Sequence, residues 1–168
     1  MIAQRCPRAA GWFAVLLVAL GGCATQPEMS AVRASAGERA PSRAEQPAVG
    51  DRAVTVALDQ LGVPYRYGGA GPGGFDCSGL VHFAYARAGK AVPRTTGELW
   101  RRTAPVDAAD ARPGDVLFFR FDGKMSHVGL YIGDGRFVHA PSSGRHVAVE
   151  RLDSEPYRTA FIRAARPY

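Results

Sequence analysis

The period of the apolar residues changes partway along the chain. In residues 51–61 and 77–87, apolar side chains recur every three or four positions, which is typical of amphipathic helices. A shorter helix is predicted around residues 96–101. Beyond residue 114 the pattern becomes short β-branched and aromatic runs separated by turn residues. The strands predicted there cover residues 115–120, 127–132, 136–140, 146–152 and 159–165. Helices followed by strands indicate an α+β domain with an antiparallel sheet.

The ends of the two longer helices are marked by polar residues and glycine. Asp51 is expected to cap the first helix, which Val63-Pro64 would end. Asp76 is expected to cap the second helix, and Gly89 to stop it. The helical spacing predicts core positions at Val54, Ala57, Leu58 and Leu61 in the first helix, and at Leu80, Phe83, Ala84 and Ala88 in the second.

Two histidines, His127 and His139, lie on the two strands of a predicted hairpin. Side chains alternate between the faces of a strand, so the two share a face only if the loop has an odd number of residues. Residues 133–135 predict a three-residue loop with Gly135 in the left-handed conformation. A two-residue Asp-Gly loop is not expected. His139 would then lie opposite Gly129, over which the two imidazoles could approach each other.

The N-terminus has the features of an export signal. Arg5 and Arg8 precede an apolar run at residues 9–20, which is shorter than the ~20 residues needed to span a bilayer. A core helix is the alternative, but the run has no polar face. The sequence LGGC, residues 20–23, resembles the lipobox of bacterial lipoproteins. This resemblance implies a signal peptide at residues 1–22 and acyl chains on Cys23.

Residue Ala24 and the segment behind it extend this prediction. In lipoproteins an Asp after the acylated cysteine usually retains the protein at the inner membrane, so Ala24 favours the outer membrane with the domain facing the periplasm. Residues 24–50 are rich in Ala, Pro, Ser and charge and lack apolar periodicity, which is typical of a flexible chain. Residues 23–50 are therefore expected to be a lipidated tether, and residues 51–168 one domain.

The charge of the chain limits the classes of binding partner that are expected. The 21 Lys and Arg residues exceed the 15 Asp and Glu residues, which gives a formal charge of +6. An excess of basic side chains can favour binding to nucleic acid, to anionic lipid or to an acidic polymer. An exported protein does not normally meet nucleic acid, and no Lys/Arg block is longer than two residues. A mild preference for an anionic wall polymer is the remaining expectation.

Three cysteines are present, and only Cys77 would remain as a thiol. Cys6 would leave with the signal peptide and Cys23 would be acylated, so Cys77 has no partner in a compartment that favours disulfides. A lone cysteine is either a buried hydrophobe or a reactive thiol. An Asp76 cap would put Cys77 at the first helical position, where free N–H groups and the helix dipole lower a thiol pKa.

A cysteine nucleophile requires a histidine base that a third group orients. Of the four histidines, His82 is expected to be structural or exposed and His146 to be solvated. Either hairpin histidine alone is an ordinary strand residue, but His127 and His139 together form a candidate base and its orienting partner.

Three segments carry a resemblance to a known family. FDCSGL, HVGLYIGDGRFVHA and, upstream, GVPYRYGG resemble the NlpC/P60 family of cell-wall cysteine peptidases. The resemblance covers residues 51–168 and implies a papain-like α+β fold, with N-terminal helices and the nucleophile helix packed on an antiparallel sheet. It implies that Cys77 is the nucleophile, His127 the general base and later the acid, and His139 the residue that orients His127.

The resemblance also implies supporting residues around the substrate. Tyr65 would help hold the substrate or the oxyanion, together with the backbone N–H of Cys77. Asp76 would bind the free amine of a stem peptide as well as cap its helix. Independently of the resemblance, the small residues Ser78 and Gly79 next to Cys77 are expected to keep the approach to the thiol small. Thr95 or Thr96 would place a hydroxyl on the substrate side. Neither a metal nor a cofactor is expected, since no HExxH or Cys/His ligand spacing occurs.

The function that this implies is a murein endopeptidase working through an acyl-enzyme. Two bonds remain open, γ-D-glutamyl–diaminopimelate and D-alanyl–diaminopimelate. The alternatives are a catalytically idle wall-binding scaffold lipoprotein and an amidase or acyltransferase with the same triad. The expected partners are peptidoglycan stem peptides and a membrane reached through the lipid anchor, and the protein is expected to be a monomer.

Overall fold

The computed structural model describes residues 48–167. The predicted signal peptide, the predicted lipidation of Cys23 and the predicted tether up to residue 47 lie outside the described residues. Within 48–167, no helix is both long and apolar enough to cross a membrane.

The first helix, α1 (Val49–Leu58), differs from its prediction at both ends. It begins at Val49, two residues before Asp51; the N-cap residue is Ala48, and no side chain caps the helix. The prediction that Asp51 is the cap is therefore wrong, because Asp51 lies inside the first turn. The helix stops at Leu58, and Leu61 is 48% exposed rather than in the core. Gly62 follows with a left-handed φ of 82°, which carries the chain away from the helix axis.

The second helix, α2 (Cys77–Arg87), follows its prediction. The Asp76 side chain accepts a hydrogen bond from the Gly79 N–H at 2.6 Å, which confirms Asp76 as the cap. Gly89 has a φ of 89°, and the next N–H, of Lys90, donates to the Tyr85 carbonyl. The predicted core positions of this helix, Leu80, Ala84 and Ala88, are buried, and Phe83 is partly buried.

The remaining helices are short. They are α3 (Thr96–Arg102), the 3₁₀ turn η1 (Ala108–Asp110) and α4 (Tyr157–Ala160). The α3 helix was predicted, whereas α4 occupies residues where the last strand was expected to begin. Residues 159 and 160 are therefore helical, and the strand starts at Phe161.

A six-stranded antiparallel sheet forms the other half of the domain. Its order is β3-β8-β4-β5-β6-β7, and its strands are β3 (Ala104–Val106), β4 (Val116–Phe121), β5 (Lys124–Gly133), β6 (Arg136–His139), β7 (Ala148–Arg151) and β8 (Phe161–Arg166). A separate two-stranded ribbon pairs β1 (Ala70–Gly71) with β2 (Gly74–Phe75). Five strands of the large sheet were predicted, and β3 and the ribbon were not. The α+β class is confirmed.

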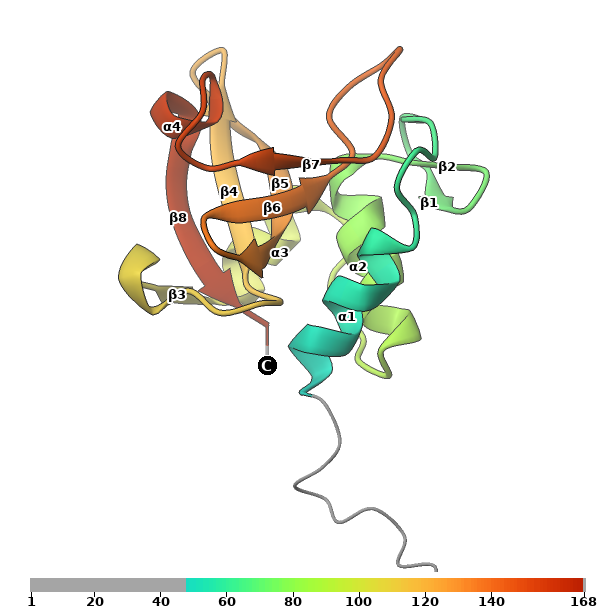
Figure 1. Cartoon of the computed structure of the whole chain (residues 1–168), viewed down its shortest axis with the longest axis horizontal. Coiled ribbons are helices and arrows are strands. Elements are labelled where there is room, and N and C mark those ends of the chain that lie inside the picture. Colours follow the sequence, from blue (N-terminus) through green and yellow to red (C-terminus); the bar gives the residue numbers. More distant parts are fainter. Residues whose placement is uncertain (1–47, 168) are drawn as a thin grey trace, which may run out of the picture. The chain divides into compact units, whose positions relative to one another are not determined.

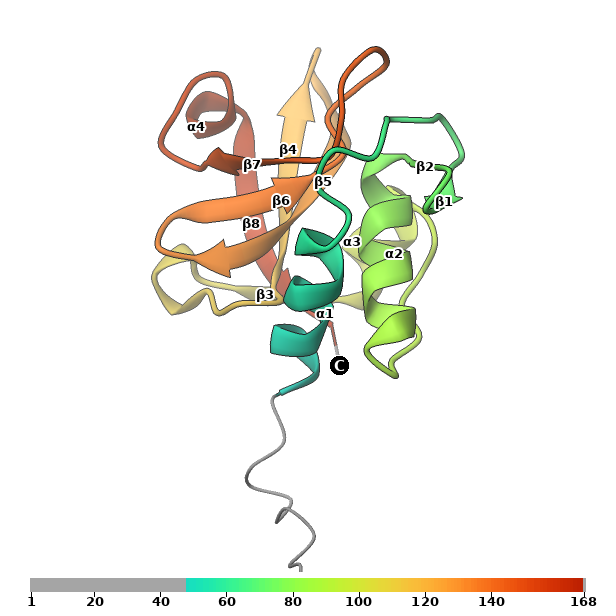
Figure 2. The same ribbon diagram turned by 45° about the vertical axis from the view of Figure 1, so that its right-hand side comes forward.

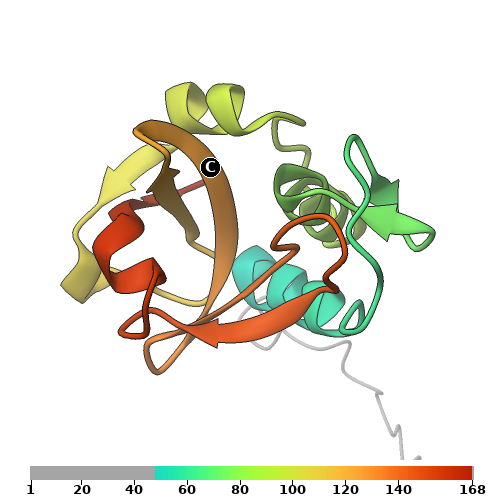
Figure 3. The ribbon, with the colours of Figure 1, turned by 90° about the horizontal axis from the view of Figure 1, so that it is seen from above.

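Helices α1 and α2 lie side by side against one face of the sheet (Figures 1 and 2). The alternation along β4 shows how the two faces divide. Val116 and Phe118 join the core under the helices, whereas Leu117 and Phe119 join a second core on the opposite face. Viewed from above, the sheet curves around that second core and α4 closes it (Figure 3).

The loop of the β5–β6 hairpin differs from its prediction, but the two histidines still lie on the same face as predicted. Gly133 pairs with Arg136, so the loop has two residues, Asp134 and Gly135, both with positive φ. The predicted three-residue loop is wrong. However, the register shifts between Tyr131 and Gly133, which leaves Ile132 as a bulge residue. The two loop residues and the bulge residue together make an odd number of residues between the paired positions. His127 and His139 therefore still share a face.

Candidate active site

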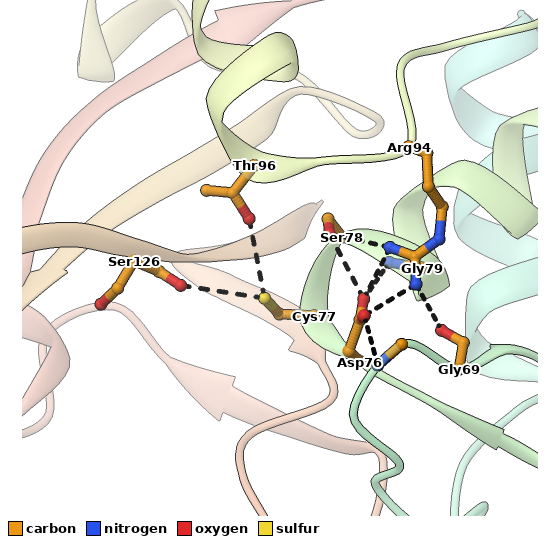
Figure 4. Close-up of polar contacts among 9 residues, drawn as sticks. Gly69, Asp76, Cys77, Ser78, Gly79, Arg94, Thr96 and Ser126 are labelled. Carbon is orange, nitrogen blue, oxygen red and sulfur yellow. Dashed lines mark hydrogen bonds and ion pairs between the residues drawn. The ribbon is translucent and has the colours of Figure 1, made fainter.

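The thiol of Cys77 lies at the first turn of α2, facing the start of β5. Its Sγ is 3.8 Å from Oγ1 of Thr96 and 4.0 Å from the carbonyl oxygen of Ser126 (Figure 4). Ser126 is an extra residue in β5, because Phe119 pairs with His127 and Arg120 pairs with Met125. This second bulge interrupts the sheet where the cysteine approaches it.

Asp76 and Arg94 form an ion pair that holds the start of α2. The two oxygens of Asp76 accept hydrogen bonds from the guanidinium at 2.7 and 2.9 Å (Figure 4). They also accept the N–H groups of Gly68 and Gly79. Burial disfavours ionisation of this carboxyl, but the hydrogen bonds from Arg94 and Gly79 prevail and lower its pKa.

Because each Asp76 oxygen already accepts at least two hydrogen bonds, the carboxylate is a structural anchor in this geometry. The predicted second role, binding a substrate amine, would require those bonds to be displaced. Arg94 was not singled out from the sequence. A signal was available, since a capping aspartate that becomes buried requires a cation.

The protonation state of Cys77 differs from the prediction. Burial raises the pKa of the thiol, and the negative charge of Asp76 raises it further. The backbone N–H of Val128, the hydroxyl of Thr96 and the backbone N–H of Ser78 act in the opposite direction without reversing the shift. The predicted lowering of the pKa is therefore wrong, and the thiol is protonated at neutral pH.

The two hairpin histidines form a buried pair. Nε2 of His127 is 2.7 Å from Nδ1 of His139, and the rings meet edge to face with their centroids 5.0 Å apart. Burial lowers the pKa of His127 to about 4 and that of His139 to about 3. Both imidazoles are therefore neutral at pH 7. The predicted contact between the two side chains is present.

The space over Gly129 is filled differently from the prediction. Continuing the register from the Leu130–Val138 pair puts His139 opposite Gly129, as expected. The ring of Phe137 occupies that space, because a Cβ added to Gly129 would lie 2.5 Å from Phe137 Cδ2. Phe137 in turn packs against His139 with centroids 5.0 Å apart. Because Gly129 has no side chain, the Phe137 ring can pack there and contact His139 of the histidine pair.

Tyr157 is a member of this cluster that the sequence did not indicate. Its hydroxyl lies 3.4 Å from Nε2 of His139, and its ring stands at 88° to the imidazole. Tyr157 belongs to α4, and no local pattern links this short helix to the hairpin. His139 is therefore held at both ring nitrogens, by His127 on one side and by Tyr157 on the other.

Two cavities meet at the thiol and share Tyr65, Cys77 and Ser126. The first, here called the Arg94 cavity, has a volume of about 550 Å³, and its other lining residues are Tyr67, Gly68, Asp76, Ser78, Arg94, Thr95, Thr96 and Gly97. The second, here called the Arg145 cavity, has a volume of about 350 Å³, and its other lining residues are Phe121, His127, Pro141, Ser142, Arg145, Pro156 and Tyr157. A substrate chain can therefore extend to both sides of the sulfur.

The threonines of the predicted site have separate positions. Thr95 caps α3, where its hydroxyl accepts the N–H of Glu98 and donates to the Glu98 carboxylate. Thr96, the alternative, has the hydroxyl that contacts the thiol.

Four other residues considered in the sequence analysis have the following positions. Tyr65 lines both cavities. The Ser78 hydroxyl lies within hydrogen-bond distance of both Asp76 and Arg94. His82 has its Nδ1 2.8 Å from the carbonyl oxygen of Val92 and is structural, and His146 is exposed.

Fold and site together define an α+β domain in which a half-buried thiol at a helix N-terminus lines one cavity with His127, a member of the buried histidine pair on the curved sheet. The family follows from comparison, since the model of the NlpC/P60 family matches residues 62–166. The chain belongs to the NlpC/P60 family. Within the described residues, no group of three or more His, Cys, Asp or Glu side chains is arranged to hold a metal ion.

Curated relatives share the domain with this chain. A probable endopeptidase of Mycobacterium bovis is 50% identical over 107 residues, which are 62% of this chain and 27% of that protein. The murein DD-endopeptidase MepH of Escherichia coli is 38% identical over 120 residues, which are 68% of this chain and 44% of that protein. The chain thus spans less than half the length of these two relatives.

Solved structures agree with the fold. An NlpC/P60 family protein from Bacillus cereus matches with a TM-score of 0.67 at 36% identity, over 73% of this chain and 40% of that one. The NlpC/p60 domain of the peptidoglycan hydrolase SagA matches with a TM-score of 0.60 at 31% identity, over 69% of this chain and 97% of that one.

Proposed function

We propose that the domain is a cysteine endopeptidase that cuts the stem peptides of peptidoglycan. The observation that carries this proposal is that Cys77, at a helix N-terminus, lines one cavity with His127, whose far nitrogen is held by His139. The names of its relatives, which include murein DD-endopeptidase and peptidoglycan hydrolase, support the substrate class.

The first step follows from the protonation states. Nε2 of His127 faces His139, so Nδ1 is the nitrogen that can accept the thiol proton. Because the imidazole is neutral at pH 7, it can take this proton while Sγ of Cys77 attacks the carbonyl carbon. The C–S bond forms, and the π electrons move to the carbonyl oxygen. The first-turn N–H of Cys77, which α2 does not need, is available to that oxyanion.

The contact between the two histidines also determines which nitrogen of each imidazole carries the proton. For Nδ1 of His127 to be free, its Nε2–H must donate to Nδ1 of His139. His139 then has its own proton on Nε2, which faces the Tyr157 hydroxyl oxygen. The hydrogen-bonded chain therefore selects one tautomer at each ring, which is the role proposed for His139.

The second half of the reaction reverses the proton transfer. His127 gives the proton to the amine nitrogen as the C–N bond breaks, and the acyl group remains on Cys77 as a thioester. His127 then takes a proton from a water molecule that attacks the thioester. The C–O bond forms and the C–S bond breaks, His127 returns its proton to Sγ of Cys77, and the carboxylic acid product leaves the restored thiol.

Purified full chain in detergent, incubated with isolated peptidoglycan, tests this function. Mass spectrometry of the soluble fragments should show new stem-peptide ends, at either γ-D-glutamyl–diaminopimelate or D-alanyl–diaminopimelate bonds. Cys77→Ser and Cys77→Ala variants should retain the fold by circular dichroism and release no fragments. Release by Cys77→Ala at the wild-type rate would refute the proposal. Wall binding without cleavage by the wild type would instead favour an idle scaffold. Products joined to another acceptor amine would favour an acyltransferase.

We also propose that Cys23 is lipidated and that the domain faces the periplasm from the outer membrane. The LGGC sequence and the following Ala24 support this placement. Two or more acyl chains would give stable anchoring. Cells grown with labelled palmitate should label the wild-type chain but not a Cys23→Ser variant. An unlabelled wild-type chain would exclude the anchor.

A further inference from the structure

The Arg145 cavity has a distinct charge. Arg145 is the single residue with a charged side chain among its described lining residues, because His127 is neutral. The other lining groups are thiol, hydroxyl, proline and aromatic side chains. A positive charge therefore stands beside the base, within the space that continues from the thiol.

The backbone of Arg145 is fixed to the site. Its carbonyl oxygen accepts the Tyr65 N–H at 2.9 Å, and its own N–H donates to the Ser142 carbonyl. The next residue, His146, forms a bridge with Pro64, and Val147 donates to Val63. The guanidinium consequently extends from an anchored segment and is not carried on a free loop.

The side chain of Arg145 retains the capacity to bind an anion. Its guanidinium pairs with Glu150 at 3.6 Å, with the arginine side chain 58% exposed, and it also makes a hydrogen bond with the Tyr157 side chain. Such a pair contributes little, and a guanidinium has five N–H donors in a planar fork that suits a carboxylate. The positive charge of Arg145 also acts on His139 and Tyr157. It lowers the pKa of His139, and it partly offsets the rise that burial causes in the pKa of Tyr157.

The orientation of the substrate follows from the reaction, so this inference rests on the proposed function. The leaving nitrogen must receive its proton from His127, and His127 lines only the Arg145 cavity. The acyl part of the substrate therefore lies in the Arg94 cavity and the amine part in the Arg145 cavity. We propose that Arg145 binds a carboxylate carried by the carbon to which the leaving nitrogen is attached.

This assignment separates the two candidate bonds. In the D-alanyl–diaminopimelate cross-link, the scissile nitrogen is attached to a carbon with a free carboxylate. In the γ-D-glutamyl–diaminopimelate bond of a tetrapeptide stem, the corresponding carboxyl group is joined to the next residue as an amide. A cationic group in the amine cavity favours the first bond, and the specificity is for cross-links.

A pair of synthetic cross-linked peptides tests the assignment. They are identical except that the carboxyl group beside the scissile nitrogen is free in one and a primary amide in the other. The wild-type chain should cut the free acid with a kcat/KM about tenfold to a hundredfold higher, as expected for loss of a charge-assisted contact. In Arg145→Gln this ratio should fall close to one. Arg136→Gln is the control, because it removes an exposed arginine that pairs with Asp134 at the β5–β6 turn and lines neither cavity. This variant should keep the wild-type ratio.

The ratio is independent of changes in the base, because both peptides depend on the same His127. A wild-type ratio near one, or an Arg145→Gln ratio equal to that of the wild type, would overturn the assignment while leaving the endopeptidase function intact. A wild-type chain that cuts neither peptide nor isolated peptidoglycan would overturn both. Binding of the free acid to Cys77→Ala should weaken by the same factor in the Cys77→Ala/Arg145→Gln variant, and unchanged binding would count against Arg145.

Discussion

Nε2 of His127 lies 2.7 Å from Nδ1 of His139, and this one bond joins two buried imidazoles across the β5–β6 hairpin. In the proposed mechanism this bond leaves the other nitrogen of His127 for the thiol, and the orientation of the His127 ring depends on His139. Four predictions follow from this cluster and the packing around it.

Replacing His139 should slow the chemical step. His139→Ala removes the acceptor of the His127 Nε2–H, and kcat should fall by about 10²–10⁴-fold, the usual contribution of a positioned base. His139→Asn, whose amide oxygen can still accept that bond, should lose less. Steady-state kinetics on a soluble cross-linked peptide measures both, with His146→Gln as the exposed-histidine control. A His139→Ala enzyme within threefold of the wild type would show that His127 orients itself.

The histidine pair should make the domain less stable in mild acid. In the folded state the pKa of His127 is lowered to about 4, whereas an unfolded histidine titrates near 6.5. Between these values the unfolded state binds more protons, so stability is complete above about pH 6.5 and declines as the pH falls toward 4.

The expected slope is up to about 1.4 kcal/mol per pH unit for each histidine. Urea unfolding between pH 5 and 7 measures this slope, which a His127→Gln/His139→Asn double variant should lose and His146→Gln should keep. Equal slopes in the wild type and the double variant would mean that the pair is not buried as described.

Tyr157→Phe should affect kcat more than stability. The ring would remain packed against Phe119 and Phe137, but the hydroxyl that faces Nε2 of His139 would be lost. One neutral hydrogen bond corresponds to roughly a fivefold decrease in kcat with an unchanged KM. The ¹⁵N shifts of the His139 ring should report a change in tautomer, which packing alone would not produce. Unchanged shifts together with a lower kcat would remove Tyr157 from the positioning of His139.

Gly129→Ala should disturb the pair through Phe137. The new methyl group would lie 2.5 Å from the Phe137 ring, and overpacking of this kind costs about 1–3 kcal/mol. Gly73→Ala is the matched control, since a Cβ there meets nothing within 4 Å. Thermal unfolding and kcat should both decrease for the first variant only. An unaffected Gly129→Ala enzyme would mean that the ring moves aside without cost.

The sequence predicts the elements well where they depend on local pattern. Helix α2 with its cap at Asp76 and its stop at Gly89 follows from residues close together in the chain, as do five of the six strands. The predicted hairpin loop was wrong because Gly133-Asp134-Gly135 suits both a two-residue and a three-residue turn. The bulge at Ile132, which decides the face of His139, has no signature in the residue itself.

Other parts of the site depend on contacts between distant segments. Arg94 reaches Asp76 across the start of α2, and Tyr157 reaches His139 from a helix that follows β7. Neither distance is encoded in spacing along the chain. The pKa of Cys77 shows the same limitation. The helix terminus alone predicts a lowered value, but the burial that reverses it depends on how α3 and β5 enclose the sulfur.

The protonated state of Cys77 has a consequence beyond peptide cleavage. Peroxides and disulfides react with thiolates, and a thiol that keeps its proton until a base removes it, as in the proposed mechanism, reacts with them slowly. The enclosure of the sulfur between Thr96 and Ser126 thus serves as chemical protection as well as alignment. An unpaired cysteine can in this way persist in an oxidising environment, and under the proposed mechanism it would react only when a substrate carbonyl group lies next to it.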